Sequence, residues 1–389
     1  MVDPTLLLRR RERLAVRHMH ERQAVARRAL AEAPAHLLVE RLAECLAEAY
    51  GIDDVELYQV DYRLAALLPL GGGETLTSGD DPAWRSFDEQ AEVVDGPARY
   101  LPVTMRGERM GVLRLAPVTG HASELAEIAT MLAHELSAVR GSTDRYTVAA
   151  RSRRLSLAAE MQWELLPGRS RARPAFSLAG QLEPAYAVRG DSFDWADDAD
   201  RLYLTTLNGM GEGVAAASLT SLATNALRNA RRAGLDLGDQ AALADQAVWA
   251  YHGGTQHVSA LLLQLDLATG LVTAVDAGSP RLMILRDGEV IDQELVAQFP
   301  LGMFEGTMYH EQRFHLAAGD RLMVVSDGVL DAISAAGQYG DQQLASFVRD
   351  ARSLAPLQAV RSLLADLRAF VGGDLVDDAV AVCLDWAPA

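Results

Sequence analysis

Lysine is absent from the 389-residue sequence, and cysteine occurs only twice, as Cys45 and Cys383. Two cysteines cannot form the disulfide framework of a small secreted scaffold, and such scarcity is typical of a reducing compartment. The sequence also lacks any run of about 18 apolar residues without charges, so no membrane-spanning helix is predicted. The start, MVDPTLLLRRRER, puts arginines after a short apolar run, unlike a secretory signal. We therefore expect a cytoplasmic protein.

Positive charge is scarce as well. There are 53 acidic and 36 basic residues apart from histidine, which gives a net charge of −17. A surplus of this sign argues against a general nucleic-acid binder. The hydrophobic share of 49% and the charged share of 23% are ordinary for a globular protein. The length predicts two or three domains.

The first 140 residues predict a helical segment followed by a small α+β module. Residues 5–50 carry apolar side chains at spacings of three and four, with an interruption at Pro34. Strands are predicted for VELYQVDY and RLAALLPL, a hairpin around Arg106-Gly107-Glu108, and an amphipathic helix from residue 122. This order resembles a GAF sensory domain. We therefore predict an N-terminal helix over residues 1–35 and a GAF-like domain over 36–140.

Residues 141–168 are predicted to be a helical linker. The helical pattern runs through TVAARSRRLSLAAEMQWELL until Pro167 ends it. A long helix between two modules favours signal transmission and a homodimer through that helix. A plain connecting segment is the alternative.

The remaining residues, 169–387, alternate predicted strands and helices, with polar loops at four strand ends. These loops hold, in order, Asp191 with Asp194, Asn208-Gly209, Ser326-Asp327-Gly328 and Asp377-Asp378. Any one of them alone is an ordinary turn sequence. Four in order, each beside a strand, predict a site of oxygen ligands for a hard dication, Mg²⁺ or Mn²⁺.

The order and spacing of these motifs resemble the SpoIIE-like branch of the metal-dependent protein serine/threonine phosphatases, the PPM family. The resemblance covers residues 155–386, and its motifs are Met161–Pro167, Gly190–Asp194, Asn208–Gly213, Ala277–Pro280, Pro300–Gly302, Gly319–Asp320, Ser326–Gly328 and Asp377–Asp378. It implies an α+β protein in which a β-sandwich flanked by helices follows the GAF-like domain and the linker.

The resemblance also implies a mechanism. Two divalent ions, Mn²⁺ or Mg²⁺, would activate a water that attacks the phosphorus of a phosphoserine. Asp327 and Asp377 would hold one ion, and Asp191 would hold the other, assisted by the carbonyl of Gly209. Asp194 and Asp378 would support these ligands without binding the ions. The implied substrate is a phosphoprotein, an anti-sigma-factor antagonist.

Three residues depart from the family pattern. Asn208 stands where the family has the aspartate that bridges both ions, Ser279 replaces a histidine, and Arg189 replaces a glycine. An amide can offer an oxygen but no negative charge. One charge pair at about 4 Å and an effective dielectric constant near 20 contributes roughly 4 kcal/mol. A loss of several orders of magnitude in two-ion occupancy is therefore expected.

The departure at Asn208 leaves two hypotheses for the function of the protein. A third hypothesis assigns it to a different functional class. The first is a working phosphatase with a weakened, Mn²⁺-demanding site. The second is a pseudophosphatase that acts as a sensor or scaffold. The third, a nucleotide-binding loop at Gly209–Gly213, is disfavoured because GMGEG lacks the G-x-G-x-x-G spacing and no G-K-[ST] element occurs.

Overall fold

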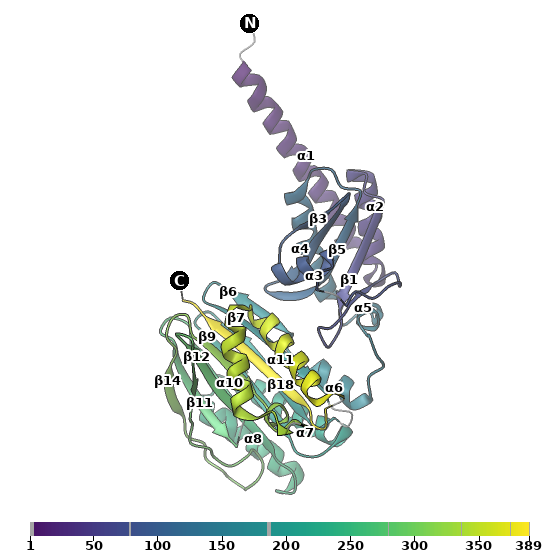
Figure 1. Ribbon diagram of the computed structural model, residues 1–389. Coiled ribbons are helices and arrows are strands. Elements are labelled where there is room, and N and C mark those ends of the chain that lie inside the picture. The colour runs from purple at the N-terminus through teal and green to yellow at the C-terminus, as the bar shows by residue number, and fades with distance from the viewer. Residues whose placement is uncertain are drawn as a thin grey trace. The chain divides into compact units, whose positions relative to one another are not determined.

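The computed structural model describes residues 4–77, 79–184, 188–278, 280–335, 337–373 and 375–388, with side chains from residue 17 onward. The chain divides into two compact units, Met1–Arg154 and Leu155–Ala389 (Figure 1). None of the helices within the described ranges is both long and apolar enough to cross a membrane. The division falls inside the predicted linker.

The N-terminal unit combines one antiparallel sheet with helices. The sheet has the strand order β2-β1-β5-β4-β3. Its strands are β1 (Asp54–Val60), β2 (Leu67–Pro69), β3 (Val93–Asp95), β4 (Ala98–Met105) and β5 (Glu108–Ala116). The helices are α1 (Pro4–Glu32), η1 (Ala35–Leu37), α2 (Leu38–Tyr50), α3 (Pro82–Glu89), α4 (Ala122–Val139) and α5 (Arg145–Ala149).

The apolar spacing of the N-terminal helices is explained by one core. Leu30 of α1, Leu42 of α2 and Leu132 of α4 are buried together with Leu57 and Leu113 of the sheet. The predicted break at Pro34 and the amphipathic helix from residue 122 are confirmed.

The three predicted strand regions of this unit have different outcomes, and VELYQVDY is confirmed as most of β1. The hairpin is confirmed, and its turn residues Arg106 and Gly107 both have positive φ, as a tight hairpin turn requires. RLAALLPL is mostly not a strand, since only Leu67–Pro69 pairs and Leu64 adopts a φ of 53°. The assignment as a GAF-like domain stays a prediction.

The expected continuous helix over residues 143–166 is wrong. Two short helices, α5 and α6 (Leu157–Leu165), are separated by residues 150–156, which are not helical. The hydroxyl of Ser156 accepts a hydrogen bond from the backbone N–H of Ala159 at 3.2 Å, so a new helix begins there.

The C-terminal unit contains two larger antiparallel sheets. One has the order β14-β11-β10-β9-β8 and the other β13-β12-β15-β18-β7-β6. The first uses β8 (Asp191–Asp197), β9 (Arg201–Gly209), β10 (Val258–Asp266), β11 (Leu271–Ala277) and β14 (Gln312–His315). The second uses β6 (Ser170–Arg173), β7 (Phe176–Glu183), β12 (Arg281–Arg286), β13 (Glu289–Asp292), β15 (Arg321–Val325) and β18 (Ala379–Trp386). A small hairpin joins β16 (Ile333–Ser334) to β17 (Gly337–Gln338).

The two sheets pack face to face between layers of helices. Gly180 of β7 leaves room for Phe193 of β8, because a Cβ there would lie 2.8 Å from its ring. Helices α10 (Gly340–Asp350) and α11 (Pro356–Val371) cover the sheet that contains β18 (Figure 1). Helices α7 (Gly213–Arg232) and α8 (Leu237–His252) pack on the sheet that contains β9 and β11, and the remaining helices are α9 (Asp327–Leu330) and η2 (Ala351–Ser353). The predicted α+β fold, a β-sandwich flanked by helices, is confirmed.

Candidate site at the acidic end of the sandwich

Two neighbouring strands bring Asp191 and Asn208 together. Asp191 is the first residue of β8 and pairs directly with Asn208, near the end of β9. The sequence placed Asp191 and Asp194 after a strand, but both lie within β8, and Asn208 and Gly209 are the last residues of β9 rather than a loop.

Close backbone packing fixes this corner. The N–H of Gly209 donates to the carbonyl of Gly190 at 3.1 Å, and the hydroxyl of Thr220 in α7 donates to the same carbonyl at 2.6 Å. A Cβ on Gly209 would lie 2.2 Å from that hydroxyl oxygen, so only glycine fits this contact.

The other sheet supplies Asp327 and Asp377 in the same way. Asp327 follows β15 and Asp377 precedes β18, and these strands are paired neighbours. Ser326 ties the two segments together, since its N–H donates to the carbonyl of Val380 and its hydroxyl oxygen accepts from the N–H of Val380. A Cβ on Gly328 would lie 1.9 Å from the carbonyl oxygen of Asp378, so glycine is required after Asp327.

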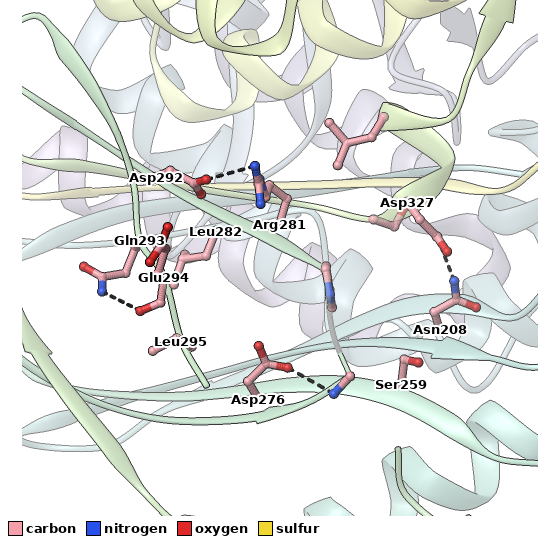
Figure 2. Close-up of a pocket in the computed structure, with 14 residues that line it drawn as sticks. Asn208, Ser259, Asp276, Arg281, Leu282, Asp292, Gln293, Glu294, Leu295 and Asp327 are labelled. Atoms are coloured by element: carbon pink, nitrogen blue, oxygen red, sulfur yellow. Dashed lines mark hydrogen bonds and ion pairs between the residues drawn. The ribbon is translucent and has the colours of Figure 1, made fainter. Parts of the chain in front are cut away.

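A side-chain hydrogen bond joins these two halves. The amide Nδ2 of Asn208 donates to Oδ1 of Asp327 at 2.8 Å (Figure 2). The resemblance assigns both positions to metal ligands, which must present oxygen lone pairs. In this orientation Asn208 instead presents a donor to its neighbour. The amide therefore occupies part of the coordination capacity of Asp327.

Asp191 has unusual surroundings for a carboxylate. It is fully buried, and neither of its oxygens has a hydrogen-bond partner of ordinary geometry. Burial raises the pKa of Asp191 well above its usual range, and the nearby Asp378, Asp327 and Asp377 raise it further, although the Ser326 hydroxyl opposes this. A buried carboxylate beside other carboxylates requires a compensating cation or a proton.

Asp377 is partly buried and faces a cation of the chain itself. Its Oδ1 lies 3.9 Å from Nε of Arg189, whose Nη2 lies 3.5 Å from Oε1 of Glu212. Burial raises the pKa of Asp377 and the charge of Asp327 adds to the rise, whereas Arg189 lowers it. The sequence did not single out Glu212, which gives no signal beyond its position between two glycines.

Asp378 holds the surrounding backbone in place. Its Oδ2 accepts hydrogen bonds from the N–H groups of Arg189 and Gly190, at 2.8 and 3.0 Å, and from Nε2 of Gln162 at 2.9 Å. Gln162, in α6, also donates to the carbonyl of Asp191 at 3.0 Å. This fully buried carboxylate therefore positions the segment that carries Asp191.

Asp194 lies in a different environment. It is bound by two arginines of α7, with Nη2 of Arg228 at 2.8 Å and Nη1 of Arg231 at 3.1 Å from its oxygens. Arg228 also donates to the carbonyl of Leu165 at the end of α6. Asp194 thus connects β8, α7 and α6 instead of facing the other acidic residues.

A cavity of about 400 Å³ opens beside the Asn208–Asp327 hydrogen bond (Figure 2). Asn208 and Asp327 line it on one side and Arg281 lies further away (Figure 2), and Ser326 is also among its lining residues. Arg281 is held by Asp292 at 2.9 Å and by Asp341 at 3.1 Å. Ser279, the residue at the position of the family's histidine, lies outside the described residues.

The fit to a divalent ion differs between the two halves of this site. No group of three or more His, Cys, Asp or Glu side chains within the described ranges is arranged to hold an ion. The unpartnered, buried oxygens of Asp191 are suited to a dication, since oxygen ligands are what Mg²⁺ and Mn²⁺ prefer. Asn208 and Arg189 bring N–H donors and a positive charge to the remaining carboxylates, which does not suit a second ion.

The C-terminal unit is thus a helix-flanked β-sandwich with carboxylates at one end. Residues 198–387, just under half of the chain, match the family model described as Stage II sporulation protein E (SpoIIE). This match supports a SpoIIE-type phosphatase domain in the C-terminal unit. No curated protein matches the chain.

Several solved structures are similar to parts of the chain or to all of it. The RsbU and RsbW domains of Rv1364c from Mycobacterium tuberculosis share 23% identity, over 56% of this chain and 63% of that one, with a TM-score of 0.49. This chain thus spans less than two thirds of that structure. The SiaA-PP2C domain of Pseudomonas aeruginosa shares 22% identity, over 54% and 85%, with a TM-score of 0.48. A SpoIIE structure from Bacillus subtilis, with the phosphatase domain and a fragment of the regulatory domain, shares 16% identity, over 99% of both chains, with a TM-score of 0.47.

Proposed function

We propose that the C-terminal unit is a metal-dependent protein phosphatase that hydrolyses phosphoserine on a regulatory protein. One observation carries this proposal: Asp191 is fully buried beside Asp327, Asp377 and Asp378, and among the described residues no hydrogen-bond partner meets its oxygens with ordinary geometry. Such a cluster needs a bound cation or a proton to offset its charge, and it lies at the end of a sandwich whose sequence matches the SpoIIE family.

Different residues would bind the ion, orient the backbone and accommodate the substrate. Asp191 and the carbonyl of Gly209 would hold a dication, Mn²⁺ or Mg²⁺, which supplies Lewis-acid activation and compensating charge. Asp378 orients the backbone before Asp191 through its bonds to the N–H groups of Arg189 and Gly190. The cavity beside Asn208 and Asp327 offers space for the phosphoserine and its flanking residues.

Regulation and partner belong to the same proposal. The N-terminal unit would act as a GAF-like sensor over residues 36–140, and the segment 141–168 would transmit its state and support a homodimer. The substrate would be an anti-sigma-factor antagonist, as the resemblance implies. Gln162 supports the transmission, because this residue of α6 contacts both the Asp191 carbonyl and Asp378. Light scattering of the full chain at micromolar concentration tests the dimer, and a monomer would contradict it.

The activity is tested on the full chain with phosphoserine peptides and Mn²⁺, with phosphate release as the signal. We expect Mn²⁺-dependent release that the Asp191→Asn variant loses by at least about 100-fold, because the buried carboxylate supplies the charge that retains the ion. Asp194→Asn, a matched change three residues away, should retain Mn²⁺ dependence. Release that is equal in the native chain and Asp191→Asn would overturn the proposal.

A second candidate function is a pseudophosphatase that binds a phosphoprotein, or its unphosphorylated form, without turnover. The hydrogen bond from Asn208 to Asp327 favours it, because it diverts a ligand of the expected centre. The Asn208→Asp variant separates the two. If the native chain is inactive and Asn208→Asp is active, the pseudophosphatase is correct. Because Asn-Gly sequences deamidate, intact mass and peptide mapping must show that Asn208 is unchanged in the native sample.

A further inference from the structure

Two N–H-bearing side chains face the carboxylates that the resemblance assigns to one ion. The amide of Asn208 donates to Asp327 at 2.8 Å, and the guanidinium of Arg189 lies 3.9 Å from Asp377. The Nε of Arg189 is buried and has no hydrogen-bond partner of its own. A cation is therefore already present at this side of the site, as part of the chain.

We propose that Arg189 and Asn208 together take the place of one of the two ions, so that the site holds a single dication beside Asp191. This inference rests on the proposed function, since it concerns the ion that the phosphatase would use. It extends that function by specifying how many ions the chain binds and which of its side chains set that number.

The charges of the two replacements support a single ion. The resemblance places an aspartate at position 208 and a glycine at position 189, whereas this chain has Asn208 and Arg189. The first replacement removes one negative charge and the second adds one positive charge. Together they shift the net charge of the site by +2, which equals the charge of one dication. A second dication would therefore enter a site that lacks the negative charge to retain it.

The position of the remaining ion follows from the proposed carboxylate ligand that the side chains of Arg189 and Asn208 do not pair with, Asp191. The side chains of Arg189 and Asn208 are paired with Asp377, Glu212 and Asp327, and neither supplies a hydrogen bond to the oxygens of Asp191. Asp191 is also less accessible than Asp377, being fully buried where Asp377 is partly exposed. Asp191 thus retains the need for a counter-charge, while Asp377 faces the guanidinium of Arg189 and Asp327 accepts the amide hydrogen bond of Asn208.

The test counts bound Mn²⁺ on the full chain by electron paramagnetic resonance, which detects free Mn²⁺ during a titration. We expect one Mn²⁺ per native chain and two per Arg189→Ala/Asn208→Asp chain, the second binding at least about 100-fold more tightly than any second ion in the native chain. The matched control Arg201→Ala/Asn225→Asp makes the same charge changes on exposed residues elsewhere in this unit and should bind one. Two ions in the native chain, none in it, or no additional ion in the double variant would overturn the inference.

Two further measurements keep the outcome interpretable. If circular dichroism shows that the double variant does not fold, the Asn208→Asp variant is titrated alone, and its second ion should bind at least about tenfold more tightly than in the native chain. An unchanged second affinity in that variant would count against the inference. Phosphate release is measured on the same samples: a change in ion number without hydrolysis in any form refutes the proposed phosphatase alone, whereas hydrolysis with unchanged ion number refutes this inference alone.

Discussion

Asp191 and Asp194 lie three residues apart in β8, both are buried, and their surroundings are opposite. Asp194 meets two arginines, Arg228 and Arg231, within 3.1 Å. Among the described residues, no cation faces Asp191 and no donor meets its oxygens with ordinary hydrogen-bond geometry; its neighbours are the Ser326 hydroxyl and the carboxylates of Asp378, Asp327 and Asp377. Burial alone therefore does not distinguish a structural carboxylate from a functional one.

The difference lies in what the opposite elements supply. Helix α7 supplies guanidinium groups to Asp194, whereas the β15 and β18 ends supply more carboxylates to Asp191. A buried charge with partners can be neutral or favourable for folding, but one without partners is costly. A dication or a proton bound in the folded state would offset that cost at Asp191.

The largest effect that this comparison predicts is for Asp194→Ala. Its removal leaves two guanidinium groups unpaired in a largely buried position, so we expect the free energy of unfolding to fall by about 3–5 kcal/mol. Urea denaturation of the C-terminal unit within the full chain measures this. Asp200→Ala, an exposed aspartate just beyond the same strand, should change the value by no more than about 0.5 kcal/mol. Equal effects of the two changes would show that the arginine pairs contribute nothing.

A middle-sized effect is expected at Glu124, a paired carboxylate of the N-terminal unit. Burial alone would raise the pKa of Glu124, but hydrogen bonds from Arg22, His121 and Tyr50 outweigh it and lower the pKa to about 2. A lowered folded pKa contributes stability above the unfolded pKa of roughly 4.3, and this stability is lost as the pH falls toward 2. Glu124→Gln should therefore reduce the free energy of unfolding by about 2 kcal/mol at pH 7 and by much less near pH 2.

Urea denaturation at several pH values between 2 and 7 checks the Glu124 prediction. The control is Glu21→Gln, which breaks an exposed pair with Arg17 on α1 and should have an effect within about 0.5 kcal/mol at every pH. A Glu124→Gln effect that is independent of pH would mean that the ionised form is not what stabilises this unit.

The fold was largely predictable because apolar spacing is a local signal. The spacing predicted α1, α2 and α4, and the Arg106-Gly107 turn predicted the β4–β5 hairpin. The linker was predicted wrongly as one continuous helix. Its composition favours a helix throughout, but Ser156 caps the N-terminus of α6, so a new helix begins there. RLAALLPL was apolar enough for a strand, but the turn at Leu64 confines pairing to three residues.

The sequence predicted which residues belong to the candidate site but not which hydrogen bonds and ion pairs they make. The order of acidic residues at strand ends identified Asp191, Asp327 and Asp377, and it identified the departure at Asn208. The sequence could not show that Asn208 donates to Asp327. These residues are far apart in the sequence, and their hydrogen bond depends on how the two sheets approach each other. For the same reason the sequence could not separate Asp194 from Asp191, since Arg228 and Arg231 reach β8 only through the packing of α7.

The smallest change in the free energy of unfolding is expected for Asp191→Asn in the presence of a chelator. Unlike the changes above, it should be an increase. The amide removes a carboxyl group whose ionised form is costly to bury beside other carboxylates, so the free energy of unfolding at neutral pH should rise by about 1 kcal/mol instead of falling. Adding Mn²⁺ should then stabilise the native chain and leave Asp191→Asn unchanged, because only a ligand that binds the folded state shifts its stability. Asp194→Asn, the same substitution at the paired carboxylate, should destabilise with or without Mn²⁺. If Asp191→Asn also lowered the free energy of unfolding in chelator, the native Asp191 carboxylate would have stabilising partners within the chain. Asp191 would then be a structural carboxylate like Asp194.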